Sequence, residues 1–144
     1  MSFENGRSNQ RRDNYGKQSY GDAVKLTKDN YVEVAKAAID NLKNSEEKKL
    51  VTTTKIRGLL SLLADIYNEV QQGKEDTLNE RVNYLKVRFL YEAGRESTVK
   101  KFVNTAHILD YINSIKGEKS EFILFYHYME ALIAYFKFYG LDKE

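Results

Sequence analysis

The sequence predicts an all-α fold, a compact bundle of about five helices preceded by a disordered N-terminal tail. The chain of 144 residues contains no proline, so the strongest helix breaker is absent. From Ala23 onward, apolar residues recur at the three- and four-residue spacing of amphipathic helices, with glycine or hydroxyl residues at the expected boundaries. We therefore expect a tail over residues 1–22 and a single helical-bundle domain over residues 23–144.

The tail has the composition of a segment that does not fold alone. Residues 1–22 contain no Leu, Ile or Val and are rich in Asn, Gly, Ser, Gln and Arg. Such a segment buries too little apolar surface to offset the conformational entropy lost on ordering, so we expect disorder. The basic and aromatic residues in it are able to touch RNA loosely, but an unstructured start is the favoured interpretation. They are Arg7, Arg11, Arg12, Tyr15 and Tyr20.

The first two helices are expected from clear start and stop signals. The first runs from about Thr27, a plausible cap, to Leu42. The second begins at the hydroxyl cluster of residues 52–54 and ends near Gly73, which suits a left-handed stop. It carries the most regular apolar stripe in the chain. The stripe consists of Ile56, Leu59, Leu60, Leu63, Ile66, Tyr67 and Val70.

Three further helices are expected, each followed by a glycine that ends it. They span residues 76–93, 97–115 and 120–139, with Gly94, Gly117 and Gly140 as the stops. Ser97 is the expected cap of the fourth helix, which should run without a break as far as Ile115.

The fifth helix is apolar nearly all round. One broad face consists of Phe122, Ile123, Phe125, Met129, Leu132, Ile133 and Phe136. A second group of aromatic residues extends the apolar surface to other sides of the helix. This group consists of Tyr128, Tyr135, Phe138 and Tyr139. A helix of this kind lies at the centre of a bundle or presents a face to another subunit, and these two alternatives are compatible on different faces. The second group is therefore our candidate partner interface.

The composition excludes several classes of function. The absence of cysteine rules out a disulfide scaffold, a thiol nucleophile and thiolate metal sites. His107 and His127 lie on different expected helices and belong to no metal-ligand motif. We find no nucleophile elbow, phosphate-binding glycine loop or paired-carboxylate motif, so neither an enzyme nor a metal or cofactor site is expected.

The chain is also expected to be a soluble, cytoplasmic protein. The N-terminal residues contain no apolar stretch typical of a signal peptide. The most hydrophobic segment, residues 122–139, contains His127, Glu130 and Lys137, which argues against a membrane span. The formal net charge of +2 is too small to indicate nucleic acid by bulk charge alone, so the arrangement of the charges matters more.

That arrangement is most informative in the third expected helix. Arg81, Arg88 and Arg95 are seven residues apart and drift by only about 20° per heptad, so they form a row along one side of the helix. Tyr84 and Tyr91 lie beside this row. Guanidinium groups bind phosphates and tyrosine rings stack on bases, which favours an RNA-binding surface. A plainer interpretation is that Arg88 pairs with an acidic neighbour, Glu92, and that the tyrosines close a core.

Several motifs of the chain resemble the small subunit of type III-A CRISPR (Csm) effector complexes. The resemblance covers roughly residues 27 to 140. The matching blocks are residues 53–62 (TTKIRGLLSL), 84–95 (YLKVRFLYEAGR), 127–132 (HYMEAL), 134–135 (AY) and 138–140 (FYG). The block at residues 84–95 is the most specific, since all twelve positions match the family pattern. The tail has no counterpart.

The resemblance implies a helical bundle without nuclease activity. In that family, several copies stack along the complex as an inner filament, beside the backbone subunits that hold the guide RNA, and contact the guide RNA and the target RNA. Target cleavage is attributed to the backbone subunit, and DNA cleavage and cyclic-nucleotide signalling to the large subunit. The implied partners are therefore guide and target RNA, these two kinds of subunit and neighbouring copies of the same chain, in antiviral defence.

The resemblance also carries over the basic positions of its motifs. These are Lys55, Arg57, Lys86, Arg88 and Arg95, and geometry alone adds Arg81. Lys86 lies about 200° around the helix from Arg88, so the two do not serve one narrow patch. We expect Lys86 to border the core, where it either lays its stem over apolar surface or pairs with a neighbouring subunit.

Two other functions compete with RNA binding. The first is a helical adaptor whose aromatic last helix docks a partner, with the arginines merely solvated. The second is a helix-turn-helix DNA-binding protein that uses the turn at Gly94. The second is disfavoured because the arginine row precedes that turn, whereas such motifs read bases with the helix that follows it.

Overall fold

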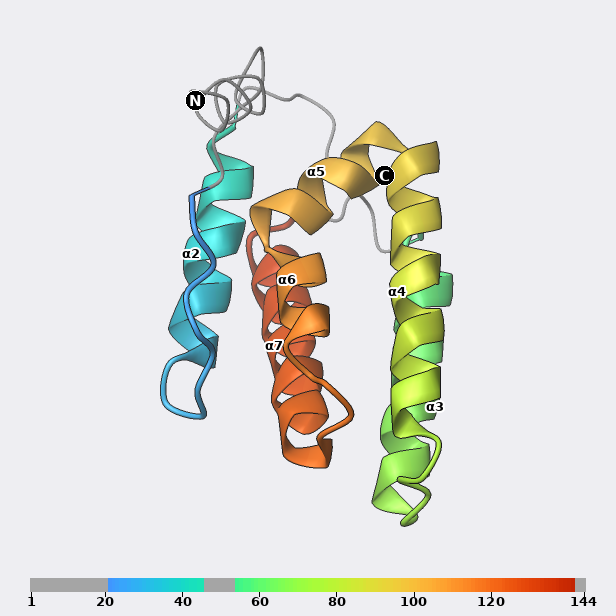
Figure 1. The fold of residues 1–144 in the computed structure, drawn as a ribbon. Coiled ribbons are helices and arrows are strands. Elements are labelled where there is room, and N and C mark those ends of the chain that lie inside the picture. The colour runs from blue at the N-terminus through green and yellow to red at the C-terminus, as the bar shows by residue number, and fades with distance from the viewer. Residues whose placement is uncertain (1–20, 46–53, 142–144) are drawn as a thin grey trace, which may run out of the picture.

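The structure, a computed structural model, describes residues 21–45 and 54–141, and within these residues all regular secondary structure is helical (Figure 1). The helices are α2 (Tyr31–Lys43), α3 (Arg57–Gln71), α4 (Leu78–Arg95), α5 (Ser97–Thr105), α6 (Ile108–Asn113) and α7 (Lys119–Phe138). The prediction of an all-α bundle is confirmed. The tail predicted over residues 1–22 lies outside the described residues apart from its last two positions, as do residues 52 and 53 of the expected helix start.

The helices form two layers that share one core. α3 and α4 are an antiparallel pair, and α2 lies along α7 in the same direction (Figure 1). α6 runs back beside α7, and α5 crosses one end of the bundle, where it packs against both α2 and α4. The start of α3 and the end of α4 therefore lie together at the end that α5 covers.

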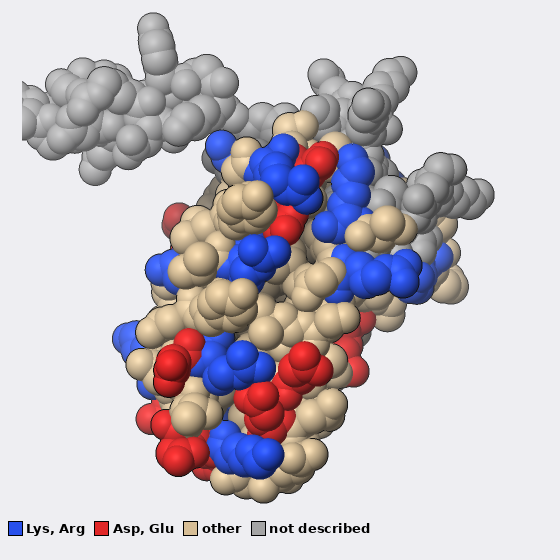
Figure 2. Space-filling model, turned by 90° about the vertical axis from the view of Figure 1, so that its right-hand side faces the viewer, with Lys and Arg blue, Asp and Glu red and all other residues tan. Residues whose placement is uncertain are grey.

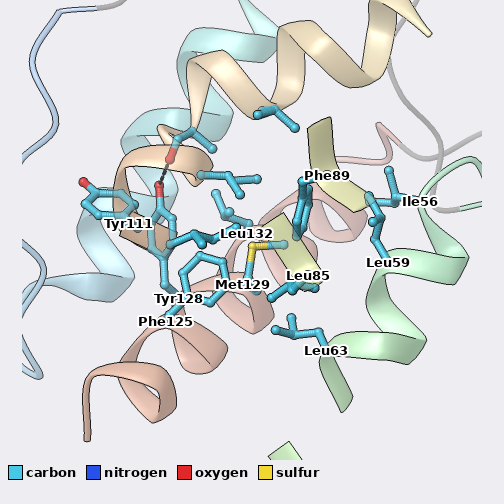
Figure 3. Packing of buried hydrophobic residues seen from close by; sticks show 14 of the residues in the cluster. Ile56, Leu59, Leu63, Leu85, Phe89, Tyr111, Phe125, Tyr128, Met129 and Leu132 are labelled. Carbon is cyan, nitrogen blue, oxygen red and sulfur yellow. Dashed lines mark hydrogen bonds between the residues drawn. The ribbon is translucent and has the colours of Figure 1, made fainter. Parts of the chain in front are cut away.

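The core is built around α7. This helix packs against α2, α3 and α6, as expected for a helix that is apolar nearly all round. Figure 3 shows its side chains meeting those of α3 and α4 in the interior. The buried side chains of α7 are Phe122, Phe125, Tyr128, Met129, Leu132 and Phe136. One side of the predicted aromatic helix is thus core.

Two of the predicted glycine stops are confirmed in detail. After α3, Gly73 has a φ of 85°; its N–H donates to the Val70 carbonyl and that of Lys74 to the Glu69 carbonyl. After α7, Gly140 has a φ of 71° and repeats the same two-bond pattern. This pattern is a Schellman motif, which needs a left-handed residue, and glycine adopts that conformation without steric cost.

The expected fourth helix is wrong, because the structure divides it into α5 and α6. His107 takes a left-handed conformation, with a φ of 56°, and interrupts the helical hydrogen bonds. The carbonyl of Ala106 instead accepts a hydrogen bond of 2.9 Å from the hydroxyl of Tyr128 on α7. A partner 22 residues further along the chain is invisible to local sequence patterns, so the break was missed.

Other boundaries shift by smaller amounts. Gly94 does not end the third helix: α4 continues to Arg95, and the extended backbone of Glu96 separates it from α5. Ser97 is the first residue of α5 rather than its cap. Thr27 does cap a turn, since its hydroxyl accepts the N–H of Asn30 at 3.1 Å, but the regular helix α2 begins only at Tyr31.

Candidate nucleic-acid interface

Arginine and tyrosine alternate along the outer side of α4. We call Arg81, Tyr84, Arg88, Tyr91 and Arg95 the Arg–Tyr stripe. Successive members are three or four residues apart, the spacing that places side chains on one side of a helix. The opposite side of α4 is buried in the core through Val82, Leu85, Phe89 and Ala93. The stripe therefore remains on the surface.

The carboxylate of Glu92 holds the two arginines in the C-terminal half of this stripe. Glu92 accepts a hydrogen bond from Arg88 on Oε2 (3.0 Å) and one from Arg95 on Oε1 (3.1 Å). The side chain of Glu92 is only 12 % exposed, so it acts as a fixed anchor between two more exposed guanidinium groups. The hydrogen bond to Glu92 raises the pKa of Arg95 above its ordinary value. Two cations and one anion leave a local excess of one positive charge.

Tyr91 lies against both arginines. The Cζ atom of Arg88 is 5.3 Å from the centre of the Tyr91 ring, and that of Arg95 is 5.9 Å away. These distances allow cation–π attraction, which holds the ring and the guanidinium groups in a defined arrangement. Tyr91 is nevertheless 56 % exposed. The cluster thus presents an aromatic ring and two cations to the outside.

Arg81, at the other end of the stripe, has a structural partner. Its Nε atom donates a hydrogen bond of 3.0 Å to Oε1 of Glu69 on α3, and its Nη2 atom donates one of 3.0 Å to Oε2 of the same carboxylate. This bidentate pair raises the pKa of Arg81 and ties α4 to α3. Binding of RNA by Arg81 stays a prediction, with fewer donors available than at Arg88 or Arg95.

The two basic positions near α3 lie at the same end as Arg95. Lys55 Nζ forms an ion pair of 3.3 Å with Glu96, the residue that follows α4. Arg57 is exposed at the first position of α3. We call Lys55, Arg57, Arg88 and Arg95 the basic end. Figure 2 shows that lysine and arginine gather in the upper part of this face, whereas acidic residues are more frequent in its lower part.

Lys86 is not part of the basic end. It is half-buried on α4, on the far border of the buried side from Arg88, which agrees with the expected separation of about 200°. Of the six predicted RNA-binding residues, the structure gathers four at one end, leaves Arg81 further along the stripe, and turns Lys86 away.

Comparisons with known proteins identify the family. The family model described as Csm2 Type III-A matches residues 28–142. The chain belongs to the Csm2 Type III-A family. A CRISPR system protein Csm2 of Streptococcus thermophilus is 46 % identical over 116 residues, which cover 80 % of this chain and 95 % of that relative. The Csm2 protein of Mycobacterium tuberculosis is 40 % identical over 119 residues, with the same two coverages. That of Enterococcus italicus is 39 % identical over 97 residues, covering 63 % of this chain and 69 % of the relative.

Membership of the Csm2 family confirms the resemblance to the type III-A small subunit. Among the described residues, no three or more His, Cys, Asp or Glu side chains form a group able to hold a metal ion. No helix in that part of this Csm2-family chain has the length and apolar character needed to cross a membrane.

One residue of the predicted partner interface is corrected. Tyr128 is 1 % exposed and its hydroxyl is bonded inside the core, so it does not contact a partner in this fold. The other three residues of that interface lie at the C-terminal end of α7. Tyr135 and Tyr139 are half-buried, and Phe138 is 82 % exposed. The Nζ atom of Lys43 on α2 lies 4.3 Å from the centre of the Tyr139 ring. Contact of these three residues with a partner stays a prediction.

Sequence reasoning missed the double role of Glu92. The spacing of Arg88 and Glu92 predicts one ion pair, but Arg95, three residues beyond Glu92, shares the same carboxylate. The signal was present, because residues at i−4 and i+3 lie on the same side of a helix. Sequence reasoning also missed two exposed apolar residues of α4, Val87 and Leu90.

Proposed function

We propose that this protein is the non-catalytic small subunit of a type III-A RNA-guided effector complex in the cytoplasm, acting in antiviral defence. Several copies stack along the guide RNA, and the basic end of each copy binds the sugar–phosphate backbone of guide and target RNA without reading sequence. The observation that carries this proposal is that one largely buried carboxylate, that of Glu92, holds both Arg88 and Arg95. Lys55 and Arg57 lie at the same end of the bundle.

The chemistry of the guanidinium groups supports phosphate binding. Each guanidinium has five N–H donors, and Glu92 takes one hydrogen bond from each of Arg88 and Arg95. Further donors are left for phosphate oxygens, which guanidinium groups bind in a bidentate manner. Backbone contacts carry no sequence information, and pairing between guide and target already provides it. A few contacts per copy are sufficient because stacked copies bind together.

The distribution of charge supports stacking of copies. The turn between α3 and α4, at the opposite end of the hairpin from the basic end, contains Glu75 and Asp76, with Glu80 in the first turn of α4. Lys74 lies in the same turn and Lys119 pairs with Glu75 at 2.9 Å, which leaves an excess of one negative charge among these five residues. A head-to-tail arrangement would bring this acidic end towards the basic end of the next copy, and a heterologous contact of this kind extends into a filament.

The first test is co-purification. A tagged chain is recovered from cells that carry the neighbouring genes, and the associated RNA and proteins are sequenced. Short guide RNAs with repeat-derived 5′ ends, together with a large and a backbone subunit, are the expected result. Recovery of those subunits without RNA would contradict the RNA-binding part of the proposal.

The second test measures how salt weakens target binding by the assembled complex. Replacing both Arg88 and Arg95 with Gln should lower the affinity and make the slope of log K against log salt shallower by about 1.4 per binding copy, since each lost phosphate contact removes about 0.7. The matched control is Lys25→Gln with Lys28→Gln, which removes two positive charges from exposed side chains in the segment that precedes α2. Equal effects of the two double variants would contradict the assignment of this face.

A second candidate function is a helical adaptor without RNA binding. The exposed Phe138 favours it, since this side chain is 82 % exposed and aromatic residues are enriched at contacts between proteins. The co-purification separates the two candidates: protein partners without RNA would favour the adaptor, and the basic end would then be ordinary solvated surface.

A further inference from the structure

The tyrosines of the Arg–Tyr stripe are placed for a contact that phosphate binding does not use. Tyr84 and Tyr91 are 51 % and 56 % exposed, although large aromatic side chains are usually covered. Each has arginines three or four residues away on the same side of α4. An exposed ring offers a face on which a nucleic-acid base stacks, whatever the identity of the base.

We propose that Tyr84 and Tyr91 stack on RNA bases that lie outside a continuous helix. The proposal rests on the RNA binding proposed above, and it adds a class of ligand: unpaired or displaced nucleotides, rather than the backbone alone. The arginines of the stripe bind the phosphates that flank each stacked base.

The spacing of the two rings determines which bases fit. Tyr84 and Tyr91 are seven residues apart, which corresponds to about 10.5 Å along a helix that rises 1.5 Å per residue. Stacked bases of one strand are about 3.4 Å apart. Bases three steps apart match this spacing, but both faces of a base within an intact stack are covered by its neighbours. The two rings therefore accept bases that have left the stack, or a strand whose successive bases are separated.

The surroundings of Tyr91 favour RNA over a protein as the occupant. Arg88 and Arg95 both lie within 6 Å of the ring centre, and Glu92 holds them there. A partner that covers Tyr91 must therefore satisfy two guanidinium groups, which suits a polyanion whose phosphates alternate with flat bases. The apolar Leu90 lies on another side of α4, about 160° from Arg88, and it supplies a control position.

Photochemical crosslinking tests the proposal in the assembled complex. Guide and target transcripts are prepared with 5-iodouridine in place of uridine, and the target is made either fully complementary or with mismatches that leave chosen uridines unpaired. After irradiation, mass spectrometry locates the crosslinked residues. We expect crosslinks at Tyr84 and Tyr91, at least tenfold more abundant at unpaired uridines than at paired ones.

Variants separate stacking from the loss of a neighbouring charge. Replacing Tyr91 with Leu should reduce the crosslink at that position more than tenfold, whereas Tyr91→Phe, which keeps an aromatic ring, should retain it within about twofold. Neither variant removes a phosphate contact, so the salt dependence of target binding should not change. Leu90→Ala should leave the crosslinks intact.

The outcomes distinguish this inference from the proposed function. If guide and target RNA bind with the expected salt dependence but crosslinks map away from both rings, or do not depend on pairing, the stacking inference is wrong and the backbone-binding function stands. If the complex contains no RNA, both proposals fail.

Discussion

α4 and α7 are both rich in tyrosine, yet they use it in opposite ways. On α4, Tyr84 and Tyr91 are exposed and alternate with arginines. On α7, Tyr128 is buried between apolar neighbours and donates its hydroxyl hydrogen bond to the Ala106 carbonyl. The aromatic ring is the same, but its role depends on whether the helix side that carries it also carries charge. Aromatic content alone therefore does not separate a binding surface from a core.

The largest expected difference between the two helices is in stability. Phe125→Ala on α7 should lower the free energy of unfolding by about 3–5 kcal/mol, because a buried ring is lost and a cavity remains. Tyr91→Ala on α4 should lower it by less than about 1 kcal/mol, since only exposed contacts are lost. Denaturation in guanidinium chloride measures both values. Similar losses for the two variants would show that Tyr91 is part of the folded core.

Tyr128→Phe should have an intermediate effect. It leaves the buried Ala106 carbonyl without its donor, which should cost about 1–3 kcal/mol of unfolding free energy near neutral pH. Urea denaturation of both proteins at pH 7 measures the difference. Tyr91→Phe is the matched control, because it removes a hydroxyl from the surface.

The same variant should change the response to alkaline pH. Burial raises the pKa of Tyr128 above its ordinary value of 10.0. Its contribution to stability is complete below pH 10, and it declines at higher pH because only the unfolded chain ionises there. The wild-type protein should thus lose stability more steeply above pH 10 than Tyr128→Phe does. Burial also raises the pKa of Tyr111, so the stability of Tyr128→Phe should still decline somewhat above pH 10. Identical slopes for Tyr128→Phe and the wild type would argue against the buried position.

The smallest effect on stability is expected at the exposed end of α7. Phe138→Ser should change the free energy of unfolding by less than about 0.5 kcal/mol, as is usual for surface substitutions, while weakening association with the other subunits. Co-purification and thermal unfolding measure the two effects. Val32→Ser on α2, another exposed apolar position, is the control and should affect neither. Equal recovery of subunits with both variants would remove Phe138 from the partner interface.

Local sequence patterns determined much of this fold and part of its site. The helical class follows from apolar spacing without proline, and the ends of α3 and α7 follow from Gly73 and Gly140. The row of Arg81, Arg88 and Arg95 follows from the period of a single helix. In each of these features, successive residues lie within about two turns of one another, the range over which helix geometry relates sequence position to space.

The tertiary structure alone decided the features that join distant parts of the chain. Tyr128 supplies the donor that the break at His107 requires, and Glu69 on α3 occupies Arg81 on α4. The antiparallel pairing of α3 and α4 brings Lys55 beside Glu96 and so assembles the basic end. The residues next to any of these positions in the sequence carry no information about a partner that lies on another helix. Which tyrosine is core and which arginine remains open to a ligand is therefore decided by packing between helices.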